Sequence, residues 1–357
     1  MPNFAKTIAN ALCVWAIVGS GAYAETSMLS PTWPRQKSAC SLGMPQVPLL
    51  PPTIQGEETY TTDMVGADLL TARWAAAFMA LQSTARVSED AANEAKKLLV
   101  QYATEQPLQW KRGGGTNGEA TLVFVTLRVG MLLALEAHFQ RDRLSSEEAN
   151  AVRAWLKQLI KQVSRTRTIT QVEVNNKHHM LAVMAYAFGY AMDDEAEKNR
   201  ALKIFRQTLR EMRKDGSIPA DARRGGSAVH YTNIAVANLV TLAELAALDG
   251  RNLYAEQSGG KNLDLAIEFL LKSTNDTTLI APYATEVATG KAGLGGARQD
   301  LSWRSDGMAG WTRYYLARFP NSPNAELIRS VTSEYTRRSV YLFEAVGGNA
   351  RCLSGQS

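Results

Sequence analysis

The sequence predicts an all-α fold in which pairs of antiparallel helices curl into an incomplete toroid around a groove. From about residue 64 onward, apolar residues recur at intervals of three and four, which is the spacing of one face of an α-helix. Runs in which β-branched and polar residues alternate are scarce. Because about ten such segments are joined by loops of modest length, we expect one large helical domain rather than a regular solenoid.

The helical segments follow one another along the chain. The first places Leu69, Ala72 and Ala76 on one face, and a later segment begins where Ser145 and Glu148 form the pattern of an N-terminal capping box. Glycine pairs and triplets punctuate the loops between them. The spacing predicts further helices around residues 178–192, 195–213, 228–248, 262–272, 308–318 and 324–343.

The N-terminus has the pattern of an export signal. One cation, Lys6, precedes an apolar run over residues 8–18, and the small residues at 22–24 offer a cleavage site after Ala24. The run is too short to span a bilayer comfortably, and no later segment reaches about 18 uncharged apolar residues, so we expect no membrane span. The signal, residues 1–24, therefore predicts a periplasmic or secreted protein.

The segment after the signal differs from the rest of the chain. Residues 25–58 are rich in proline and polar residues, so we expect an extended N-terminal arm, with the helical domain over residues 59–357. Cys13 leaves with the signal, and Cys40 and Cys352 remain near the two ends. In an oxidising compartment a disulfide between them would tie both ends to the body, while the alternative is two free buried thiols.

The composition restricts the class of ligand. The formal net charge is +5, or +4 without Lys6, a mild excess that is compatible with an acidic polymer as substrate. No block of Lys and Arg is interleaved with aromatic residues, so we expect no nucleic-acid partner. Two distant cysteines and four scattered histidines make no recognisable metal site, and we expect a monomer without a cofactor.

The first polar cluster is Asn175-Asn176-Lys177-His178-His179, just before an apolar helix. It holds two of the four histidines in the chain. One interpretation is a polar loop that caps the helix, since Asn is a favourable N-cap residue. The other is a group that neutralises a carboxylate and transfers protons at a helix N-terminus, where the helix dipole also favours an anion.

The second polar cluster occupies residues 221–233 and leads into another apolar helix. It contains Arg223 and Arg224, two glycines, and then His230 and Tyr231. One interpretation is a flexible loop before an ordinary helix start. However, a turn and about one helical turn separate Arg224 from Tyr231, which lets both side chains point into one groove. We expect His230 to support the loop or contact a ligand rather than to react, because adjacent helical residues face apart.

Together the two clusters resemble the alginate lyases of polysaccharide lyase family five. The likeness lies in Asn175-Asn176 with histidines nearby, followed by Arg-x6-Tyr-x-Asn at the head of an apolar helix. The stretch at residues 61–68 is similar to the early family motif Ser-Lys-Tyr-x-Gly-x-Asp, and residues 117–134 are similar to the second helix pair of the family. The likeness is patchy and spans roughly residues 40–250.

The resemblance implies an incomplete α/α toroid that cleaves uronic acid polymers by β-elimination. In those enzymes a tyrosine is general base and acid, and an Asn–His–Arg group holds the substrate carboxylate so that the C5 proton becomes removable. Donors aimed at that carboxylate stabilise the charge that develops on it. Tyr231 matches the tyrosine, Arg224 the arginine and Asn176 the asparagine. The other residues expected to contact substrate at the two clusters are Asn175, Lys177, His179, Arg223 and His230.

Two positions depart from the family pattern. The family has Asn-Asn-His, whereas here Lys177 follows the asparagines and the histidines come next. An ungapped match puts Lys177 on the catalytic histidine, and a shift of one residue puts His178 there. We favour His178 as the catalytic residue, because an imidazole can donate or accept a proton near neutral pH. The early lysine of the family falls on Asp63. Both departures suggest a uronate polymer other than plain mannuronan, such as glucuronan.

Aromatic side chains also suggest contacts with sugar rings. Trp110, followed by a lysine and an arginine, is a candidate for stacking on a sugar ring, and Trp303 is another, although aromatic residues at such spacing also fit the core. His138 falls in an amphipathic helix and is expected to be structural.

Two other functions fit the same sequence. A glycoside hydrolase would need two carboxylates about 5–10 Å apart in the groove, and none of the available aspartates lies in a distinctive frame. An exported polysaccharide-binding protein with an eroded site would explain Asp63 and the displaced histidine. The retained Tyr231, Arg224 and Asn176 argue against such erosion.

Overall fold

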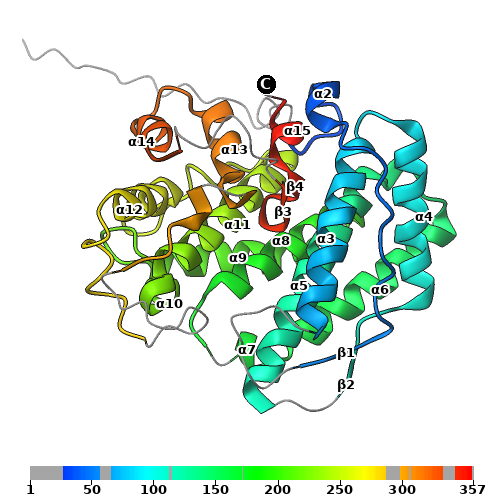
Figure 1. Ribbon diagram of the computed structural model, residues 1–357, viewed down its shortest axis with the longest axis horizontal. Coiled ribbons are helices and arrows are strands. Elements are labelled where there is room, and N and C mark those ends of the chain that lie inside the picture. The colour runs from blue at the N-terminus through cyan, green and yellow to red at the C-terminus, as the bar shows by residue number, and fades with distance from the viewer. Residues whose placement is uncertain are drawn as a thin grey trace, which may run out of the picture.

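The computed structural model describes residues 27–56, 66–111, 115–170, 172–286, 298–304, 307–332 and 342–355. Helices dominate this part of the chain (Figure 1), and its strands form two small two-stranded sheets, β1 with β2 and β3 with β4. The prediction of an all-α fold is confirmed.

The helices of the N-terminal half are α2 (Lys37–Cys40), α3 (Gly66–Thr84), α4 (Glu89–Glu105), α5 (Gly115–Phe139), α6 (Ser146–Ser164), α7 (Arg167–Thr170) and α8 (Asn176–Ala191). Those of the C-terminal half are α9 (Glu195–Glu211), α10 (Pro219–Ala222), α11 (Ala228–Leu248), α12 (Leu263–Asn275), α13 (Trp311–Arg318), α14 (Pro323–Thr332) and α15 (Ala350–Ser354). The strands are β1 (Thr53–Gln55), β2 (Gln109–Lys111), β3 (Leu342–Phe343) and β4 (Gly348–Asn349). Short 3-10 turns cover Arg141–Arg143, Gly225–Ser227, Ser302–Arg304, Gly307–Ala309 and Glu344–Val346.

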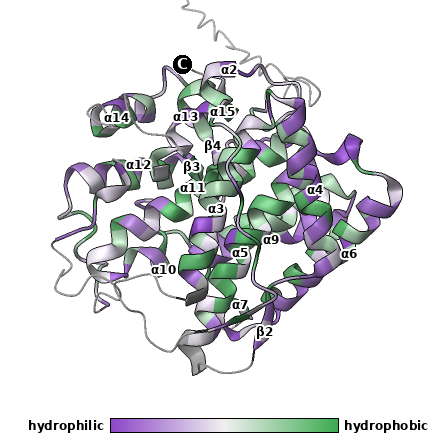
Figure 2. Ribbon diagram, turned by 45° about the vertical axis from the view of Figure 1, so that its right-hand side comes forward, coloured by the Kyte–Doolittle hydropathy of each residue, from purple (hydrophilic) through white to green (hydrophobic). Residues whose placement is uncertain are grey.

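The central helix of the fold is α8, which packs against α5, α9 and α11. Apolar and small residues occupy all sides of α8, so that nearly its whole length is buried. A helix that is apolar all round needs neighbours on every side. The outer helices α4, α6 and α9 are amphipathic instead, and Figure 2 shows the hydrophilic residues on α4 and α6.

Two segments, Gly118–Phe139 and Gly225–Leu248, are long and apolar enough to cross a membrane by length and composition alone. In each, 83 % of the most apolar window is buried inside the protein. Central helices of a helical domain have this property, because protein side chains rather than lipid cover their apolar faces.

The helix boundaries follow the predicted spacing closely for α8, α9, α11 and α12. The helix expected from residue 308 begins at Trp311, because Gly307–Ala309 form a 3-10 turn. The helix expected over residues 324–343 ends at Thr332, and its predicted last residues belong to β3, so that end of the prediction was wrong. The capping box at Ser145 is confirmed.

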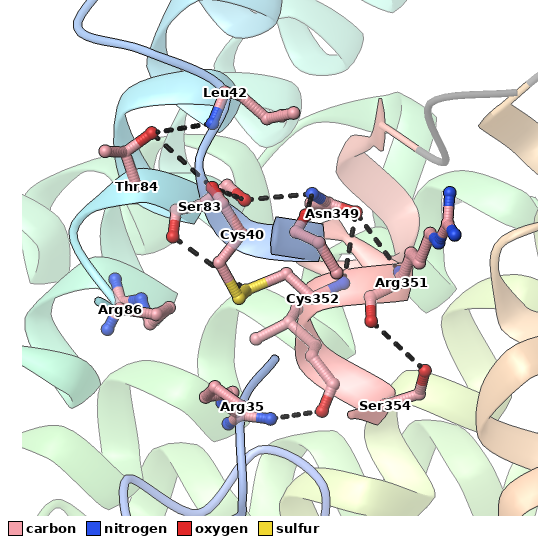
Figure 3. The surroundings of a disulfide bond; sticks show 12 residues. Arg35, Cys40, Leu42, Ser83, Thr84, Arg86, Asn349, Arg351, Cys352 and Ser354 are labelled. Atoms are coloured by element: carbon pink, nitrogen blue, oxygen red, sulfur yellow. Dashed lines mark hydrogen bonds between the residues drawn. A yellow bond between two sulfur atoms is a disulfide. The ribbon is translucent and has the colours of Figure 1, made fainter. Parts of the chain in front are cut away.

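The described part of the N-terminal segment runs over the outside of the helical body, with α2 and β1 as its regular elements. Ser27 donates a hydrogen bond to the carbonyl of Glu244 in α11 at 2.7 Å. The strand β1 pairs in parallel with β2. A disulfide joins Cys40 to Cys352 with a Cα–Cα distance of 4.7 Å, and therefore fastens the arm to α15 (Figure 3). The predicted signal, residues 1–24, lies outside the described residues.

Candidate active site

The first polar cluster forms the N-terminus of α8. Asn175 is the N-cap residue, and its Oδ1 accepts a hydrogen bond from the amide of Lys177 at 3.0 Å. The amide of Asn175 in turn donates to Nδ1 of His178 at 3.3 Å. This leaves the proton on Nε2 of His178, which donates to the carbonyl of Ile169 in α7 at 2.9 Å. Asn175 and His178 therefore hold the start of α8 against α7, as a reciprocal cap does.

His179 points away from the cap, into the interface between α8 and α9. Its side chain is buried, and its Nε2 lies 3.0 Å from Oγ1 of Thr208 in α9. Burial lowers the pKa of His179 to about 3, so the ring is neutral at ordinary pH. The prediction that His179 contacts substrate was wrong, because the residue following His178 turns into the core.

Lys177 is the residue that an ungapped match places on the catalytic histidine of the resembled family. Its side chain is buried, and Arg224 and Asp221 are the charged groups that act on it. Burial, the largest effect, and Arg224 lower the pKa of Lys177, Asp221 raises it, and the net result is a pKa of about 8. Neighbouring residues of a helix project in different directions. The charge of Arg224 thus acts on Lys177, whereas His178 binds the carbonyl of Ile169 in α7.

Asp221 in α10 connects the two clusters. Its Oδ1 accepts a hydrogen bond from the amide of Asn176, the first residue of α8, at 3.2 Å. Its Oδ2 is buried and has no hydrogen-bond partner among the described residues. Burial raises the pKa of Asp221 to about 7, although Asn176, Arg224 and Lys177 all act in the opposite direction. A carboxylate with an unpaired buried oxygen is costly unless a donor reaches it.

Arg224 and Tyr231 lie together at the start of α11. The guanidinium carbon of Arg224 is 4.4 Å from the centroid of the Tyr231 ring, and both side chains are half-buried. The ring of His230 packs edge-on against Tyr231 at 5.4 Å, and Nδ1 of His230 lies 3.8 Å from a carboxylate oxygen of Asp300. The predicted convergence of Arg224 and Tyr231 is present, and His230 lies beside them.

Acidic residues hold the arginines of this loop. Arg223 donates to Glu173 at 2.6 Å and lies 3.2 Å from Glu286. Arg224 lies 3.7 Å from the second oxygen of Glu286. Arg223 is therefore occupied by two carboxylates.

Gln299 fastens the turn in front of α11. Its side chain accepts a hydrogen bond from the amide of Val229 at 3.0 Å and donates one to the carbonyl of Gly225 at 3.0 Å. Gly225 has a φ of 51°, a left-handed conformation that glycine adopts without strain. The turn that aims Arg224 and Tyr231 thus depends on a side chain from far along the chain.

The resulting site contains a phenol, two asparagines and several cations at the N-terminus of a buried helix. The dipole of such a helix favours an anion at its N-terminus, although the amides of Asn176 and Lys177 already donate to Asp221 and Asn175. Among the described residues, no group of three or more His, Cys, Asp or Glu side chains is arranged to hold a metal ion. The described side chains thus place cations and amide groups near the phenol of Tyr231.

Comparison with known proteins identifies the family of this site. A model of the alginate lyase family matches residues 30–279, which is most of the chain. The chain belongs to the alginate lyase family. A polysaccharide lyase of Stenotrophomonas maltophilia is 24 % identical over 243 residues, which are 66 % of this chain and 68 % of that protein. An alginate lyase of Pseudomonas syringae pv. syringae is 24 % identical over 191 residues, which are 53 % of this chain and 47 % of that protein.

Solved structures show the same fold. Alginate lyase A1-III from Sphingomonas species A1 superposes with a TM-score of 0.70 at 17 % identity, covering 94 % of this chain and 93 % of that one. A histidine-to-alanine variant of alginate lyase A1-III, complexed with a tetrasaccharide, matches with a TM-score of 0.67 at 18 % identity over the same shares. The predicted toroid is confirmed, and this alginate lyase family member is a polysaccharide lyase.

The two tryptophans proposed for sugar stacking lie in different environments. Trp303 is fully buried and stacks on Trp311 with a centroid distance of 6.2 Å, so its predicted contact with a sugar was wrong. Trp110 lies half-buried in β2 and donates from Nε1 to Thr126 at 3.0 Å. Its role in substrate binding stays a prediction. Asp63 lies outside the described residues.

Sequence reasoning missed three side chains that organise the site. They are Asp221, Glu286 and Gln299. Asp221 was visible three residues before Arg224, and a carboxylate at that spacing from a candidate arginine is a usable signal. Nothing local in the sequence marks Glu286 or Gln299, because only the fold brings them to the turn before α11.

Proposed function

We propose that this polysaccharide lyase cleaves an acidic uronate polymer by β-elimination, with alginate rich in mannuronate or a related polyuronate such as glucuronan as its substrate. Tyr231 removes the C5 proton of the uronate and returns a proton to the departing O4 oxygen. Arg224 and Asn176 hold the carboxylate whose charge increases in the transition state. No cofactor enters this scheme.

One observation carries the proposal: the guanidinium of Arg224 lies 4.4 Å from the ring of Tyr231, and the charge of Arg224 acts on Lys177 at the N-terminus of α8. Elimination next to a carboxylate needs a base and a stabiliser of negative charge in one place. His178 was the other candidate for this group, but both of its ring nitrogens bind within the fold. The scheme therefore gives His178 a structural role. The tetrasaccharide complex of alginate lyase A1-III supports an oligosaccharide ligand.

An absorbance assay tests the reaction. Elimination creates an unsaturated uronate that absorbs in the ultraviolet, and hydrolysis does not. We expect new absorbance on at least one of mannuronan, guluronan, glucuronan and pectate. Release of reducing ends without absorbance would indicate a glycoside hydrolase instead, and polymer binding with neither product would indicate a binding protein.

Replacing Tyr231 tests the assignment of the base. Tyr231→Phe removes only the hydroxyl, so turnover should fall by roughly 10²–10⁴-fold while polymer binding persists. Tyr190→Phe is the matched control, because Tyr190 lies about 21 Å along α8 from the cap and packs on His138. Full activity in the Tyr231 variant would refute its assignment as the base.

We also propose that the protein is exported and acts as a monomer outside the cytoplasm. The support is the signal-like pattern of residues 1–24 and the disulfide at Cys40, which needs an oxidising compartment. N-terminal sequencing of protein from the periplasm or medium should give Glu25 as the first residue. An uncleaved chain in the cytoplasm would contradict export.

A further inference from the structure

Lys177 differs from the other cations of the site in its surroundings. It is 9 % exposed, whereas the side chains of Arg224 and Arg223 are 28 % and 38 % exposed. Arg223 binds Glu173 and Glu286. Within the described residues, the ammonium group of Lys177 has no hydrogen bond and no ion pair. A buried cation without a partner is held at a cost, and such groups mark functional positions.

Asp221 is the complementary observation. Its Oδ1 is fixed by the first amide of α8, and its buried Oδ2 lacks a donor. The charges of three cations, Arg224, Lys177 and Arg223, lower the pKa of the Asp221 carboxyl. Of these, Lys177 has the flexible side chain and a free ammonium group. The charges of Lys177 and Asp221 thus act on each other, and the hydrogen bond from α8 fixes Asp221.

We propose that Lys177 is a further catalytic residue whose ammonium group contacts the uronate carboxylate, and that Asp221 is a positioning residue that keeps Lys177 charged and aimed at that carboxylate. This inference rests on the proposed function. Asp221 acts on the ammonium group of Lys177 through its charge, and with substrate bound that ammonium group contacts the carboxylate at C6.

The reaction balances without a proton from Lys177. Deprotonated Tyr231 takes the C5 proton, and the electron pair of that bond spreads over C5 and the carboxylate. The pair then forms the C4–C5 double bond, the bond from C4 to the departing oxygen breaks, and that oxygen takes the proton back from Tyr231. Lys177 acts only through its charge, which counts most in a buried site where water screens little.

The charge of Lys177 depends on its neighbours. Burial and Arg224 lower its pKa, and Asp221 raises it, so loss of the Asp221 charge shifts the equilibrium toward neutral lysine. Above its pKa of about 8, Lys177 loses the charge that the mechanism needs.

Other titratable and charged groups surround Lys177 and Asp221. They are His178 on α8, Glu211 on α9, Glu173 before α8, Arg223, Arg224 and Glu286 around the loop after α10, His230 and Tyr231 on α11, and Asp300.

Four variants test the proposal on the cleaved polymer. Lys177→Met should lower kcat/KM at pH 7 by about 10²–10³-fold, the usual effect of losing one group that stabilises an oxyanion. Lys161→Met, an exposed lysine on the outer face of α6, is the matched control and should leave kcat/KM unchanged. The alkaline limb of the pH profile of kcat/KM reports the pKa of the group that must stay protonated in the free enzyme. This limb should move to higher pH in Lys177→Arg, because arginine keeps its charge, and to lower pH in Asp221→Asn, because Asp221 raises the pKa of Lys177.

The results that overturn the inference are equally specific. Wild-type activity in Lys177→Met, or an alkaline limb that stays in place in both Lys177→Arg and Asp221→Asn, assigns Lys177 and Asp221 a structural role. Loss of activity in His178→Gln with full activity in Lys177→Met would place the carboxylate at His178 instead.

A binding experiment separates failure of this inference from failure of the proposed function. In the Tyr231→Phe background, calorimetry with a mannuronate tetrasaccharide should show at least a tenfold loss of affinity on adding Lys177→Met. This result supports Lys177 even if the wild type forms no unsaturated product. Equal affinities overturn the role of Lys177 while leaving elimination intact, and no binding by either protein overturns both.

Discussion

Burial sets the charge of single side chains well away from the catalytic cluster, and His138 on α5 shows this most clearly. Its Nε2 lies 2.9 Å from the carbonyl of Leu29, which ties the N-terminal arm to α5. Burial lowers the pKa of His138 to about 4, so the folded protein holds a neutral imidazole that donates to the arm. The expected structural role of His138 agrees with this position.

The acid stability of the protein should depend on His138. An unfolded histidine has a pKa near 6.5, so below that pH the unfolded chain binds a proton that the folded chain excludes until about pH 4. Stability is therefore lost as the pH falls from 6.5 toward 4, by about 2 kcal/mol at pH 5. His138→Gln keeps a donor for Leu29 and should remove this part of the loss. Urea unfolding of the wild type and of His138→Gln at pH 7 and pH 5 measures this loss of stability. An identical pH dependence in the two proteins would contradict the role of His138.

The residues of the site were predictable where chemistry and spacing agree, and not where the fold decides between neighbours. Arg224 and Tyr231 meet as their spacing predicts. Among the residues after Asn176, the sequence favoured a histidine for its pKa, but helix geometry sends His178 to α7 and turns Lys177 to the site. The direction of successive side chains around a helix axis changes by about 100° per residue, so a shift of one position in the alignment changes which residue faces the site.

At the scale of helices, the fold could be predicted because most of its elements carry their own start and stop signals. The helices α8, α9 and α11 begin and end close to the predicted residues. The sequence failed where long-range contacts replace local signals. Gly307 forms a 3-10 turn whose close approach to the carbonyl of Leu342 leaves no room for a Cβ, and β3 forms through pairing with β4. Neither contact leaves a pattern within one segment.

The start of α6 offers a direct measurement of one such local signal. Oγ of Ser145 accepts from the amide of Glu148 at 3.2 Å, and the Glu148 carboxylate accepts from the amide of Ser145 at 2.7 Å. Ser145→Ala removes the first bond and should lower the free energy of unfolding by about 1 kcal/mol. Ser146→Ala is the control, because Ser146 is exposed and lies one residue past the cap. Equal stability of the two variants would show that the cap contributes nothing here.

At the scale of the whole molecule, the first and last described segments of the chain meet around α11. Glu244 on α11 is fully buried, accepts from the amide of Met28 at 3.2 Å, and is paired with Arg318 of α13 at 2.7 Å. Trp33 donates to the carbonyl of Ser354 at 3.1 Å. The arm therefore closes the side of the helical body where the C-terminus also lies. In Figure 1 that side is at the top, whereas α7 lies near the lower edge and α10 at the lower left.

This separation predicts that the disulfide stabilises the protein without serving the reaction. The bond between Cys40 and Cys352 closes a loop over a sequence separation of 312 residues, and constraining an unfolded chain in this way typically contributes about 2–5 kcal/mol. The double variant Cys40→Ser, Cys352→Ser should therefore melt at a lower temperature. Its kcat at 25 °C should match the wild type, because α2 and α15 lie at the top of Figure 1, whereas α10, which directly precedes Arg224, lies at the lower left.

Reductant provides the matched control for that variant. Added reductant should lower the melting temperature of the wild type toward that of the double variant and leave the variant unchanged, since its serines cannot be reduced. Asn349 donates to the carbonyl of Ala39 at 2.9 Å and to Ser83 at 2.9 Å (Figure 3), so the arm keeps part of its attachment when the disulfide is lost. The variant should consequently fold, and a loss of kcat in step with stability would show that closure of the arm reaches the site after all.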